Sequence, residues 1–453
     1  MLSTATSADE VPMQRAQNNG RPQVLIGEKT SACAVFLTLL LCFGLLNACN
    51  KNQDSHTASN AANELESSLR QGSAPILQDS VSLVATMKEP ASFRFATYNV
   101  SLYRDKAGEL ANDLEKGNDQ AHKIAKVVQT IRPDVLLLNE FDFDAEGRSA
   151  QSFIEEYLGV DHGESLRIEY PFHFTAEVNT GVPSGIDLDY DGSSDRWNDN
   201  YGFGKHPGQY GMLVLSKFPI RMEKVRTFRK LLWKDMPNAA IPINPDTNEN
   251  FYSAEAWGVM RISSKSHWDV PIEVDGKTVH FLVCHPTPPV FDGPEDRNGK
   301  RNHDEIRLFA DYISPDKSGY IADDNGRRGG LDGRYFVIAG DLNADPNDGA
   351  SYGNAARQLT EHPLVNSSVV PQSSGGVEAG QQQANAEHAG DAAHDTADFD
   401  DRSTGNLRAD YVLPSRTLNV LDAGVFWPKK SDPQYELVRA TDHRLVWIDV
   451  RIE

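Results

Sequence analysis

Cysteine is scarce in this sequence, with four residues among 453. Three of them, Cys33, Cys42 and Cys49, lie in the first 49 positions, and Cys284 stands alone in the remainder. A single thiol cannot close an internal disulfide, so the later part of the chain must be stabilised by a packed core rather than by covalent cross-links. A chain of this length can bury that core in one large domain or in two ordinary ones.

Basic residues are also few relative to acidic ones. The chain has 44 lysines and arginines against 65 aspartates and glutamates, which gives a formal net charge of -21. This excess argues against tight electrostatic binding to nucleic acid or to anionic lipid. It does not exclude an enzyme that acts on phosphate esters through a metal ion, because a bound cation reverses the local field.

Long hydrophobic runs are confined to one segment, residues 32–46. The run has the length of a signal peptide and is too short for a comfortable transmembrane helix, and basic residues precede it. The sequence Leu46-Asn47-Ala48-Cys49 that follows resembles the lipobox of bacterial lipoproteins, in which the cysteine is lipidated. We therefore expect residues 1–48 to be a signal peptide and Cys49 to carry the lipid. A cleaved secreted protein and a retained anchor helix are the alternatives.

The region after the lipobox changes character near Ser92. Residues 49–91 are polar, small and poor in aromatic side chains, as expected of a disordered tether between an anchor and a domain. Hydrophobic periodicity begins near Ser92, and we expect one domain over residues 92–453.

The pattern of apolar residues predicts the elements of this domain. Residues 119–131 and 302–313 carry apolar side chains at helical spacing. Strands are predicted at 93–100, 134–140, 211–216, 256–262, 279–285, 335–339, 408–413 and 445–452. Many strands with few, widely spaced helices predict sheets packed on each other with helices outside.

Two long polar segments interrupt this pattern. Residues 179–210 contain Asp187, Asp189 and Asp191 followed by a glycine, which imitates the start of a Ca²⁺ loop, and an ordinary acidic loop is the alternative. Residues 373–405 are rich in Gly, Gln, Ala, Asp and His, and we expect this insertion to be flexible, with solvated histidines.

The stretch from Tyr335 to Gly349 joins an apolar strand to a cluster of polar residues. Its apolar part stops at Gly340, and Asp341 and Asn343 follow. If the extended conformation persists for one more step, these two side chains point to the same side and can meet one ligand. A carboxylate beside an amide suits a metal-bound phosphate or water, and a plain strand-to-turn junction is the alternative.

Polar residues of similar character occur near the ends of other predicted strands. Besides Asp341 and Asn343 they are Asn99, Glu140, His285, Asp410 at the start of its strand, and Asp442 with His443 just before the last strand. Each alone has an ordinary explanation as a turn residue, a surface acid, a core histidine or half of an ion pair. Together they indicate a site built at one edge of a sheet, where rigid strands hold the side chains in place.

The same residues lie in short motifs whose order is that of a known family. The motifs are Thr97-Tyr98-Asn99, Leu138-Asn139-Glu140, Cys284-His285-Pro286-Thr287-Pro288, Ala339-Gly340-Asp341-Leu342-Asn343, Arg408-Ala409-Asp410-Tyr411 and Thr441-Asp442-His443. Through them, residues 92–453 resemble the endonuclease/exonuclease/phosphatase superfamily, which includes deoxyribonucleases, abasic-site nucleases, inositol polyphosphate phosphatases and bacterial sphingomyelinases. The resemblance implies an α/β fold, a four-layer sandwich of two packed mixed β-sheets flanked by helices.

The resemblance also implies a metal site. Glu140 would be the main Mg²⁺ ligand, with Asn99 and Asp442 nearby, and Mn²⁺ is an alternative metal. Phosphoester hydrolysis consists largely of positioning and of neutralising charge on the phosphate oxygens, so a hard cation held by carboxylate oxygens is an expected part of such a site.

Catalytic roles follow from the same resemblance. Asp341 and Asn343 would position the attacking water and the phosphate, and His285 would donate to a phosphate oxygen or to the leaving group. His443, oriented by Asp410, would be the catalytic histidine. Whether Asp341 or His443 accepts the proton of the water stays open.

Two charged loops are candidates for holding an anionic substrate. Arg297 and Arg301 lie in a Pro- and charge-rich loop after His285, and Lys205 and His206 lie in a Gly-rich stretch farther upstream. Ordinary charged surface loops are the alternative for both.

The sequence therefore predicts a Mg²⁺-dependent phosphoric ester hydrolase that cleaves phosphomono- or phosphodiester bonds outside the cytoplasm. We expect a monomer in the cell envelope, facing the periplasm or the exterior and held to the membrane only by the lipid on Cys49. An extracytoplasmic nuclease, with nucleic acid as its substrate, is the main alternative. A non-catalytic surface binding protein on the same fold is a second one, and the intact set of motif residues argues against it.

Overall fold

A computed structural model of the protein describes residues 92–453. The predicted signal peptide, the lipidated Cys49 and the predicted tether lie outside the described residues. Within residues 92–453, none of the helices combines the length and the apolar character needed to cross a bilayer.

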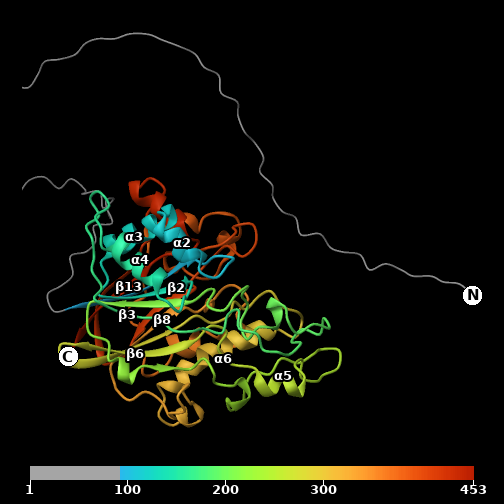
Figure 1. The fold of residues 1–453 in the computed structure, drawn as a ribbon. Helices are drawn as coiled ribbons and strands as arrows, with labels where there is room; N and C mark the ends of the chain where they lie inside the picture. The colour runs from blue at the N-terminus through green and yellow to red at the C-terminus, as the bar shows by residue number, and fades with distance from the viewer. Residues whose placement is uncertain (1–91) are drawn as a thin grey trace, which may run out of the picture. The chain divides into compact units, whose positions relative to one another are not determined.

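The described residues form two mixed β-sheets (Figure 1). The first has six strands, in the spatial order β12 (Leu418–Val425), β13 (Val446–Ile452), β1 (Phe93–Leu102), β2 (Val135–Phe141), β4 (Met212–Ser216) and β3 (Phe172–Phe174). The second has five, in the order β11 (Asp410–Pro414), β8 (Phe336–Asp341), β7 (Lys277–Cys284), β6 (His267–Val274) and β5 (Arg226–Thr227). In each sheet one central pair is parallel, β1 with β2 and β7 with β8, and its outer neighbours are antiparallel.

Alternate side chains along each strand point to opposite faces of its sheet, so one set packs between the two sheets and the other packs against the outer layer. In β2, Val135 and Leu137 join the core between the two sheets, whereas Leu136 and Leu138 face the helices outside. This is the period of two expected for a strand buried on both faces. The core between the sheets includes Trp268 of β6, which is fully buried.

Helices cover the outer faces and complete four layers (Figure 1). The helices α2 (Glu109–Glu115), α3 (Asp119–Ile131) and α4 (Arg148–Ser152) lie on the first sheet, and α5 (Ala254–Val259) and α6 (Arg297–Tyr312) lie on the second. The apolar stripe of α3 packs on the first sheet, and the side chain of Asn118 accepts a hydrogen bond from Ala121 N at the start of this helix. The predicted four-layer α/β sandwich is confirmed.

Short elements fill the connections. They are η1 (Phe153–Leu158), η2 (Trp197–Asp199), η3 (Met222–Lys224), η4 (Trp233–Asp235), η5 (Ser318–Tyr320), η6 (Tyr352–Asn354), α7 (Arg357–Thr360), α8 (Ser374–Ala379), η7 (Gln383–Glu387), η8 (Ala392–His394), the two-stranded ribbon of β9 (Ala397–Asp398) with β10 (Asn406–Leu407), and η9 (Pro433–Ala440).

Two predicted elements differ in the structure. The predicted strand at 256–262 is wrong, because helix α5 occupies most of it. Ser253 begins this helix by accepting a hydrogen bond from Ala256 N at 3.0 Å, a capping arrangement that competes with the extended conformation. Helix α6 begins at Arg297, earlier than the predicted start at 302.

The insertion at 373–405 contains α8, η7, η8 and β9. Several of its side chains are buried, among them Thr396 and Ala397. Ala397 forms a backbone bridge with His443, so the insertion packs beside the segment that precedes β13. Its flexibility stays a prediction. His388 and His394 are both half-buried.

Candidate active site

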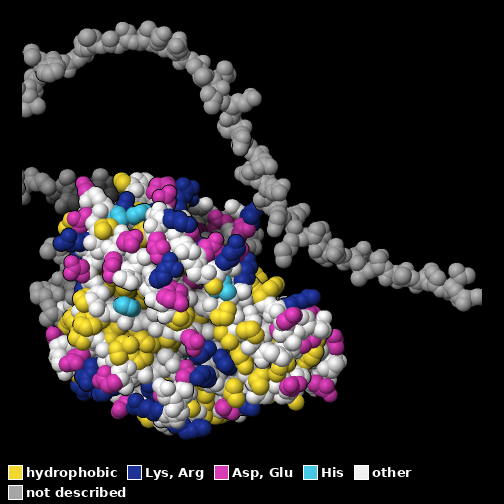
Figure 2. Space-filling view, in the orientation of Figure 1, with side chains coloured by type: hydrophobic (Ala, Val, Ile, Leu, Met, Phe, Trp, Pro, Cys, Tyr) yellow, Lys and Arg dark blue, Asp and Glu magenta, His cyan; other side chains and the backbone are white. Residues whose placement is uncertain are grey.

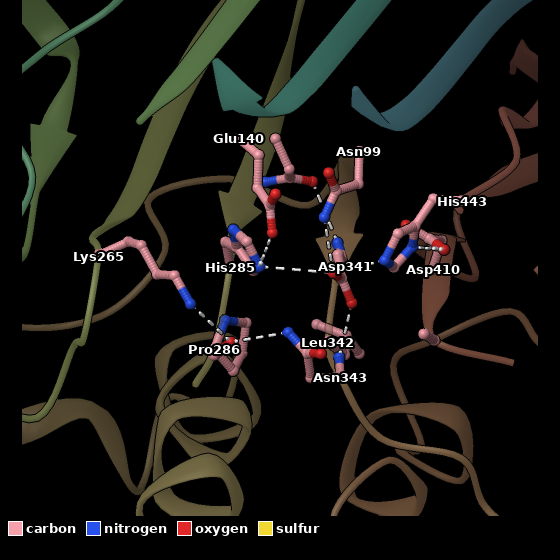
Figure 3. Close-up of polar contacts among 12 residues, drawn as sticks. Asn99, Glu140, Lys265, His285, Pro286, Asp341, Leu342, Asn343, Asp410 and His443 are labelled. Atoms are coloured by element: carbon pink, nitrogen blue, oxygen red, sulfur yellow. Dashed lines mark hydrogen bonds and ion pairs between the residues drawn. The ribbon is translucent and has the colours of Figure 1, made fainter. Parts of the chain in front are cut away.

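The candidate residues gather where the two sheets meet at one edge (Figure 3). Asn99 and Glu140 come from β1 and β2 of the first sheet, and His285 and Asp341 come from the ends of β7 and β8 in the second. Because each parallel pair sends its carboxyl ends to the same edge, four side chains that are distant in sequence share one small volume.

Asn139 joins the two sheets at this edge. Its amide nitrogen donates to Cys284 O at 3.3 Å, and its amide oxygen accepts from Asp341 N at 3.1 Å. Sequence reasoning gave this residue no role, although it lies between Leu138 and Glu140 in a recognised motif.

Gly340 allows β8 to approach β7 closely just before Asp341. Its φ is 155°, and a Cβ built on it would lie 2.0 Å from Cys284 O. Only glycine fits this position, because any side chain would meet the neighbouring backbone.

Asp341 is the buried centre of the group. One carboxylate oxygen accepts from the amide of Asn99 at 3.0 Å and lies 3.4 Å from Nε2 of His285 and 3.6 Å from Nε2 of His443. Burial opposes ionisation of this carboxyl, but the positive charge of His443 and the bond from His285 outweigh it and hold the pKa below its ordinary value.

Asn343 lies beside Asp341 in a different way from that expected. Its φ of 51° ends the strand, so the extended conformation that would direct both side chains to one side does not persist. Its backbone N–H donates to the other oxygen of Asp341 at 2.8 Å, and its side-chain amide donates to Pro286 O at 3.1 Å. The left-handed turn, rather than strand alternation, brings the two residues together.

His443 and Asp410 form a buried pair. Nδ1 of His443 donates to Oδ2 of Asp410 at 2.8 Å, which leaves Nε2 directed toward Asp341. Burial alone would lower the pKa of His443, but Asp410 and Asp341 raise it to about 10. Burial raises the pKa of Asp410, although the charge of His443 opposes that shift. His443 is thus held as an imidazolium with a fixed orientation.

Thr396, from the insertion at 373–405, supports this pair. Its hydroxyl donates to Oδ2 of Asp410 at 2.9 Å and accepts from Ala409 N and Asp410 N, both at 2.9 Å. Ala397 pairs with His443 through a backbone bridge, and the ring of Phe399 meets the imidazole edge-on at 5.5 Å. Sequence reasoning missed these contacts, because they depend on how a low-complexity insertion folds back.

Glu140 adopts a left-handed conformation with φ of 58° at the end of a strand, which is uncommon for this residue type. Its side chain is 20% exposed, and Oε1 lies 3.9 Å from Nε2 of His285. Burial raises its pKa to about 7, while His443 and the amide of Asn99 act in the opposite direction. A carboxyl group with this pKa is poised to ionise when a cation arrives.

Asp442 is exposed beside this group. Its negative charge, together with that of Glu140, contributes to raising the pKa of Tyr103, after the larger effect of burial. The hydroxyl of Thr441, the residue before Asp442, donates to Asn99 O at 3.1 Å, which places Asp442 near the end of β1. Binding of a divalent cation by Glu140, Asn99 and Asp442 stays a prediction.

A second grouping of candidate ligands overlaps this one. Asp341, Asp410 and His443 offer ligand atoms within 4.8 Å of one another, an arrangement consistent with a divalent metal site. However, Nδ1 of His443 and Oδ2 of Asp410 already bond to each other, and Asp410 Oδ1 is the oxygen left without a partner among the described residues.

Asp187, Asp189 and Asp191 also lie within that distance of one another. Asp189 accepts a hydrogen bond from Asn198, the residue in place of the glutamate of a calcium loop. Binding of Ca²⁺ here stays a prediction.

His285 and Lys265 form the wall opposite His443 (Figure 3). Burial lowers the pKa of His285 to about 4, so its imidazole is neutral near pH 7. Its Nδ1 atom is buried and has no hydrogen-bond partner among the described residues. Nε2 faces Asp341 and Glu140 and is the atom available to a ligand.

Lys265 is a cation that sequence reasoning did not single out. The residue is 7% exposed, and Nζ donates to Pro286 O at 3.3 Å. Burial lowers its pKa, and the charges of Glu305 and Glu140 oppose that shift. Glu305 of α6 holds the flanking loops by accepting from Ser264 N at 2.6 Å and from Thr287 N at 2.7 Å. No sequence motif indicated a role for Lys265, because only tertiary packing brings it to this edge of the sheets.

The four predicted substrate-binding residues have other partners. Arg301 is buried and donates to the carbonyl oxygens of Ile262, Tyr201 and Arg261, so its predicted role is corrected to a structural one. Arg297 pairs with Glu295. Lys205 pairs with exposed Asp105 at 2.7 Å, and His206 Nε2 lies 3.1 Å from Arg104 O. Contact of Arg297, Lys205 or His206 with substrate stays a prediction.

Two cavities, of about 520 and 430 Å³, lie beside Phe143 and Glu177. Neither is lined by residues of the candidate set. The candidate site at the sheet edge therefore lies outside these two cavities.

Residues 96–443 match the endonuclease/exonuclease/phosphatase family. The chain belongs to this family. Members of the endonuclease/exonuclease/phosphatase family are hydrolases that act on phosphoester bonds. The matched range begins on β1 and ends at His443, so it contains all eight residues predicted for the metal site and for catalysis.

Several solved structures of the family resemble the chain. An endonuclease/exonuclease/phosphatase from Beutenbergia cavernae is 18% identical, with a TM-score of 0.45, over 80% of this chain and 72% of that one. Sphingomyelinase C from Streptomyces griseocarneus is 15% identical, with a TM-score of 0.40, over 80% and 100%. Beta toxin from Staphylococcus aureus with bound magnesium ions is 14% identical, with a TM-score of 0.39, over 80% and 100%. No curated protein matches the chain.

Proposed function

We propose that this protein is a divalent-metal-dependent phosphoric ester hydrolase that cleaves phosphomono- or phosphodiester bonds outside the cytoplasm. The observation that carries the proposal is the buried pair of His443 and Asp410, whose free imidazole nitrogen points at Asp341 beside the carboxylate of Glu140. An ion pair that only stabilises the fold would not require a second carboxylate and a second histidine beside it at the same edge of the sheet.

The roles follow from the protonation states. His443, protonated and held by Asp410, stabilises negative charge or returns a proton to the leaving oxygen. Asp341, ionised and bonded by Asn99 and Asn343, orients the attacking water or accepts its proton. Neutral His285 donates through Nε2 to a phosphate oxygen.

The metal would be held by Glu140, with Asn99 and Asp442 beside it. When bound, a divalent cation such as Mg²⁺ or Mn²⁺ neutralises charge on the phosphate oxygens and lowers the pKa of bound water. The raised pKa of Glu140 supports this assignment, because an isolated carboxylate at this depth is disfavoured until a cation compensates it.

A nuclease activity is the alternative within the same chemistry. On the face drawn in Figure 2, basic side chains are interspersed with acidic ones rather than gathered in a stripe. With a net charge of -21, this distribution favours a small phosphate ester over a long polyanion.

The proposal is tested by hydrolysis assays on the purified full chain with Mg²⁺, Mn²⁺, Ca²⁺ or EDTA. The substrates are bis-p-nitrophenyl phosphate, p-nitrophenyl phosphate, plasmid DNA and a choline phospholipid. We expect metal-dependent turnover that His443→Ala lowers by at least about a hundredfold. His173→Ala, at an exposed histidine of edge strand β3, is the matched control and should retain turnover. Equal activity in both variants, or turnover that persists in EDTA, would contradict the assignment.

The cellular location is a separate part of the proposal. We propose that the protein is anchored in the cell envelope through a lipid on Cys49, and the lipobox-like sequence before that residue supports this. Detergent-phase partitioning of the protein expressed in a bacterial host tests the anchor. Cys49→Ser should move the protein to the aqueous phase, whereas Cys42→Ser should not. A wild-type protein that stays in the aqueous phase would refute the anchor without bearing on the hydrolase activity.

A further inference from the structure

A row of four aromatic side chains leads away from the candidate metal site. Tyr103 follows β1, the strand of Asn99, and its ring lies 4.5 Å from that of Tyr210. The ring of Tyr210 lies 6.2 Å from Phe203, which lies 4.9 Å from Trp197. Three of the four come from the 179–210 insertion, and neither the sequence analysis nor the proposed mechanism gave these aromatic side chains a role.

The row is open to solvent along its length. Tyr103 is 37% exposed, Phe203 54% and Trp197 52%, and Tyr210 is half-buried between them. Large exposed aromatic side chains that touch one another in a line are costly to leave in water, and such patches mark ligand sites.

Hydrogen bonds fix the inner end of the row to the catalytic strand. Asp142, two residues beyond Glu140, accepts from Arg104 N at 2.8 Å and from Tyr210 N at 3.0 Å. Gln209 also donates to Arg104 O at 2.7 Å. The loops of Tyr103 and Tyr210 are therefore tied to each other and to the end of β2.

Tyr210 is held in a left-handed conformation with φ of 55°. That conformation is a genuine outlier for a bulky residue, and the bond from Tyr210 N to Asp142 maintains it. Backbone strain of this kind is kept where a side chain must be aimed, and here it directs an aromatic ring beside Tyr103. After burial, the charge of Glu140 contributes to raising the pKa of both tyrosines, which agrees with their place next to the site.

Two basic side chains beside the row already have acidic partners. Lys205 bonds to Asp105 at 2.7 Å, and Arg104 bonds to Asp113 at 2.7 Å. The row therefore offers ring faces and edges rather than cations, which suits an uncharged group and not a second phosphate.

We propose that Tyr103, Tyr210, Phe203 and Trp197 form a subsite for the organic group of the substrate, and that this group carries an aromatic or other flat apolar ring. The inference rests on the proposed phosphoesterase function, because a substrate group can reach the row only if the phosphate is bound beside Glu140. A bilayer is a less suitable occupant, since the row begins at the catalytic edge and is bordered by ion pairs.

Two substrates that share a leaving group test the subsite. Methyl p-nitrophenyl phosphate and phenyl p-nitrophenyl phosphate both release p-nitrophenol and differ only in the retained ester group. We expect the wild-type full chain to prefer the phenyl ester in kcat/KM. Phe203→Ala and Trp197→Ala should each lower the phenyl-to-methyl ratio about tenfold, the usual effect of losing one aromatic stacking partner.

Controls separate recognition from general damage. Phe203→Tyr keeps a ring and should keep the ratio, and Phe172→Ala, at an exposed phenylalanine of edge strand β3, should change neither substrate. Equal losses for both esters in Phe203→Ala, with the ratio unchanged, would overturn the subsite. A second outcome would also overturn the subsite. If Phe203→Ala no longer sedimented with phosphatidylcholine vesicles but kept the wild-type phenyl-to-methyl ratio, the row would be a membrane contact.

A binding measurement distinguishes failure of this inference from failure of the proposed function. Calorimetric titration with phenylphosphonate and methylphosphonate needs no turnover. If neither ester is hydrolysed but phenylphosphonate binds about tenfold more tightly and Phe203→Ala removes the difference, the subsite stands and the hydrolase proposal fails. Equal binding of the two phosphonates by the wild type would overturn the subsite.

Discussion

Thr396 donates its hydroxyl hydrogen to Asp410 across 2.9 Å, on the carboxylate oxygen that also accepts from His443. The histidine of the candidate site thus depends on a threonine from an insertion that composition alone marks as loop. Asp410 keeps its negative charge in a buried place because two donors share one oxygen.

Replacing Thr396 by valine should therefore impair the reaction through His443. We expect kcat/KM to fall about ten- to a hundredfold, the cost of removing a hydrogen bond to a charged group. The limb of the pH profile set by His443 should also move to higher pH, because Asp410 without this donor holds the imidazolium proton more tightly. Thr396→Ser should restore both values. A uniform loss at every pH would instead mean that Thr396 only stabilises the fold.

Lys265 should contribute to binding the phosphate. Its ammonium group is buried at the site and donates only one weak bond, to Pro286 O, among those that the structure records for its side chain. We expect Lys265→Met to lower kcat/KM at least about tenfold, since a charge-assisted hydrogen bond to an anion is lost. Lys116→Met, at an exposed lysine after α2, is the control. Steady-state kinetics on the substrate found active decide the matter, and wild-type values in Lys265→Met would exclude this role.

Glu140 should make the metal-free protein less stable as the pH rises. Its folded-state pKa of about 7 exceeds the ordinary value of 4.5, so the folded protein binds this proton more tightly than the unfolded chain does. The resulting stabilisation is fully present below pH 4.5 and is lost as the pH rises through 7.

Thermal unfolding with and without Mg²⁺ at pH 5 and pH 8 checks this sign. Mg²⁺ should raise the Tm more at pH 8, where Glu140 is ionised. Glu140→Gln should raise the metal-free Tm at pH 8 and abolish the response to Mg²⁺, whereas Glu223→Gln, at an exposed glutamate, should alter neither. An undiminished response to Mg²⁺ in Glu140→Gln would remove this residue from the ligand set.

Gly340 should tolerate no side chain. In Gly340→Ala the new Cβ would lie 2.0 Å from Cys284 O, so β7 and β8 would have to separate beside the site. We expect a loss of at least about 2 kcal/mol in the free energy of unfolding, measured by urea denaturation. Gly258→Ala is the matched control, because its Cβ meets no atom within 4 Å in helix α5, and it should be neutral or slightly stabilising. Similar midpoints for the two variants would contradict the close approach.

Much of the fold could be predicted from the sequence, because the spacing of apolar residues within each strand or helix is a local pattern. The apolar runs of β1, β2, β8 and β13 and the helical spacing of α3 survive in the structure with small changes at their ends. The segment at 256–262 misled because a few apolar residues fit a strand and a helix equally well, and Ser253 decided between them.

The sequence predicted those residues of the candidate site that lie at the ends of strands. Residues at strand ends, such as Glu140 and His285, could be placed by asking where apolar runs stop. Lys265 and Thr396 could not, because their positions follow from loops that fold back from distant parts of the chain. Arg301 misled for a related reason: its charge looked available in the sequence, but three backbone carbonyl groups occupy it.

The last strand of the chain, β13, is an interior strand of the first sheet, between β12 and β1. During synthesis β1 is made long before β13, so the edge of β1 that pairs with β13 stays unpaired until β13 follows, and His443 is made just before that strand. The candidate site can therefore assemble only after β13 has been made. Assembly of the candidate site is thus coupled to completion of the first sheet.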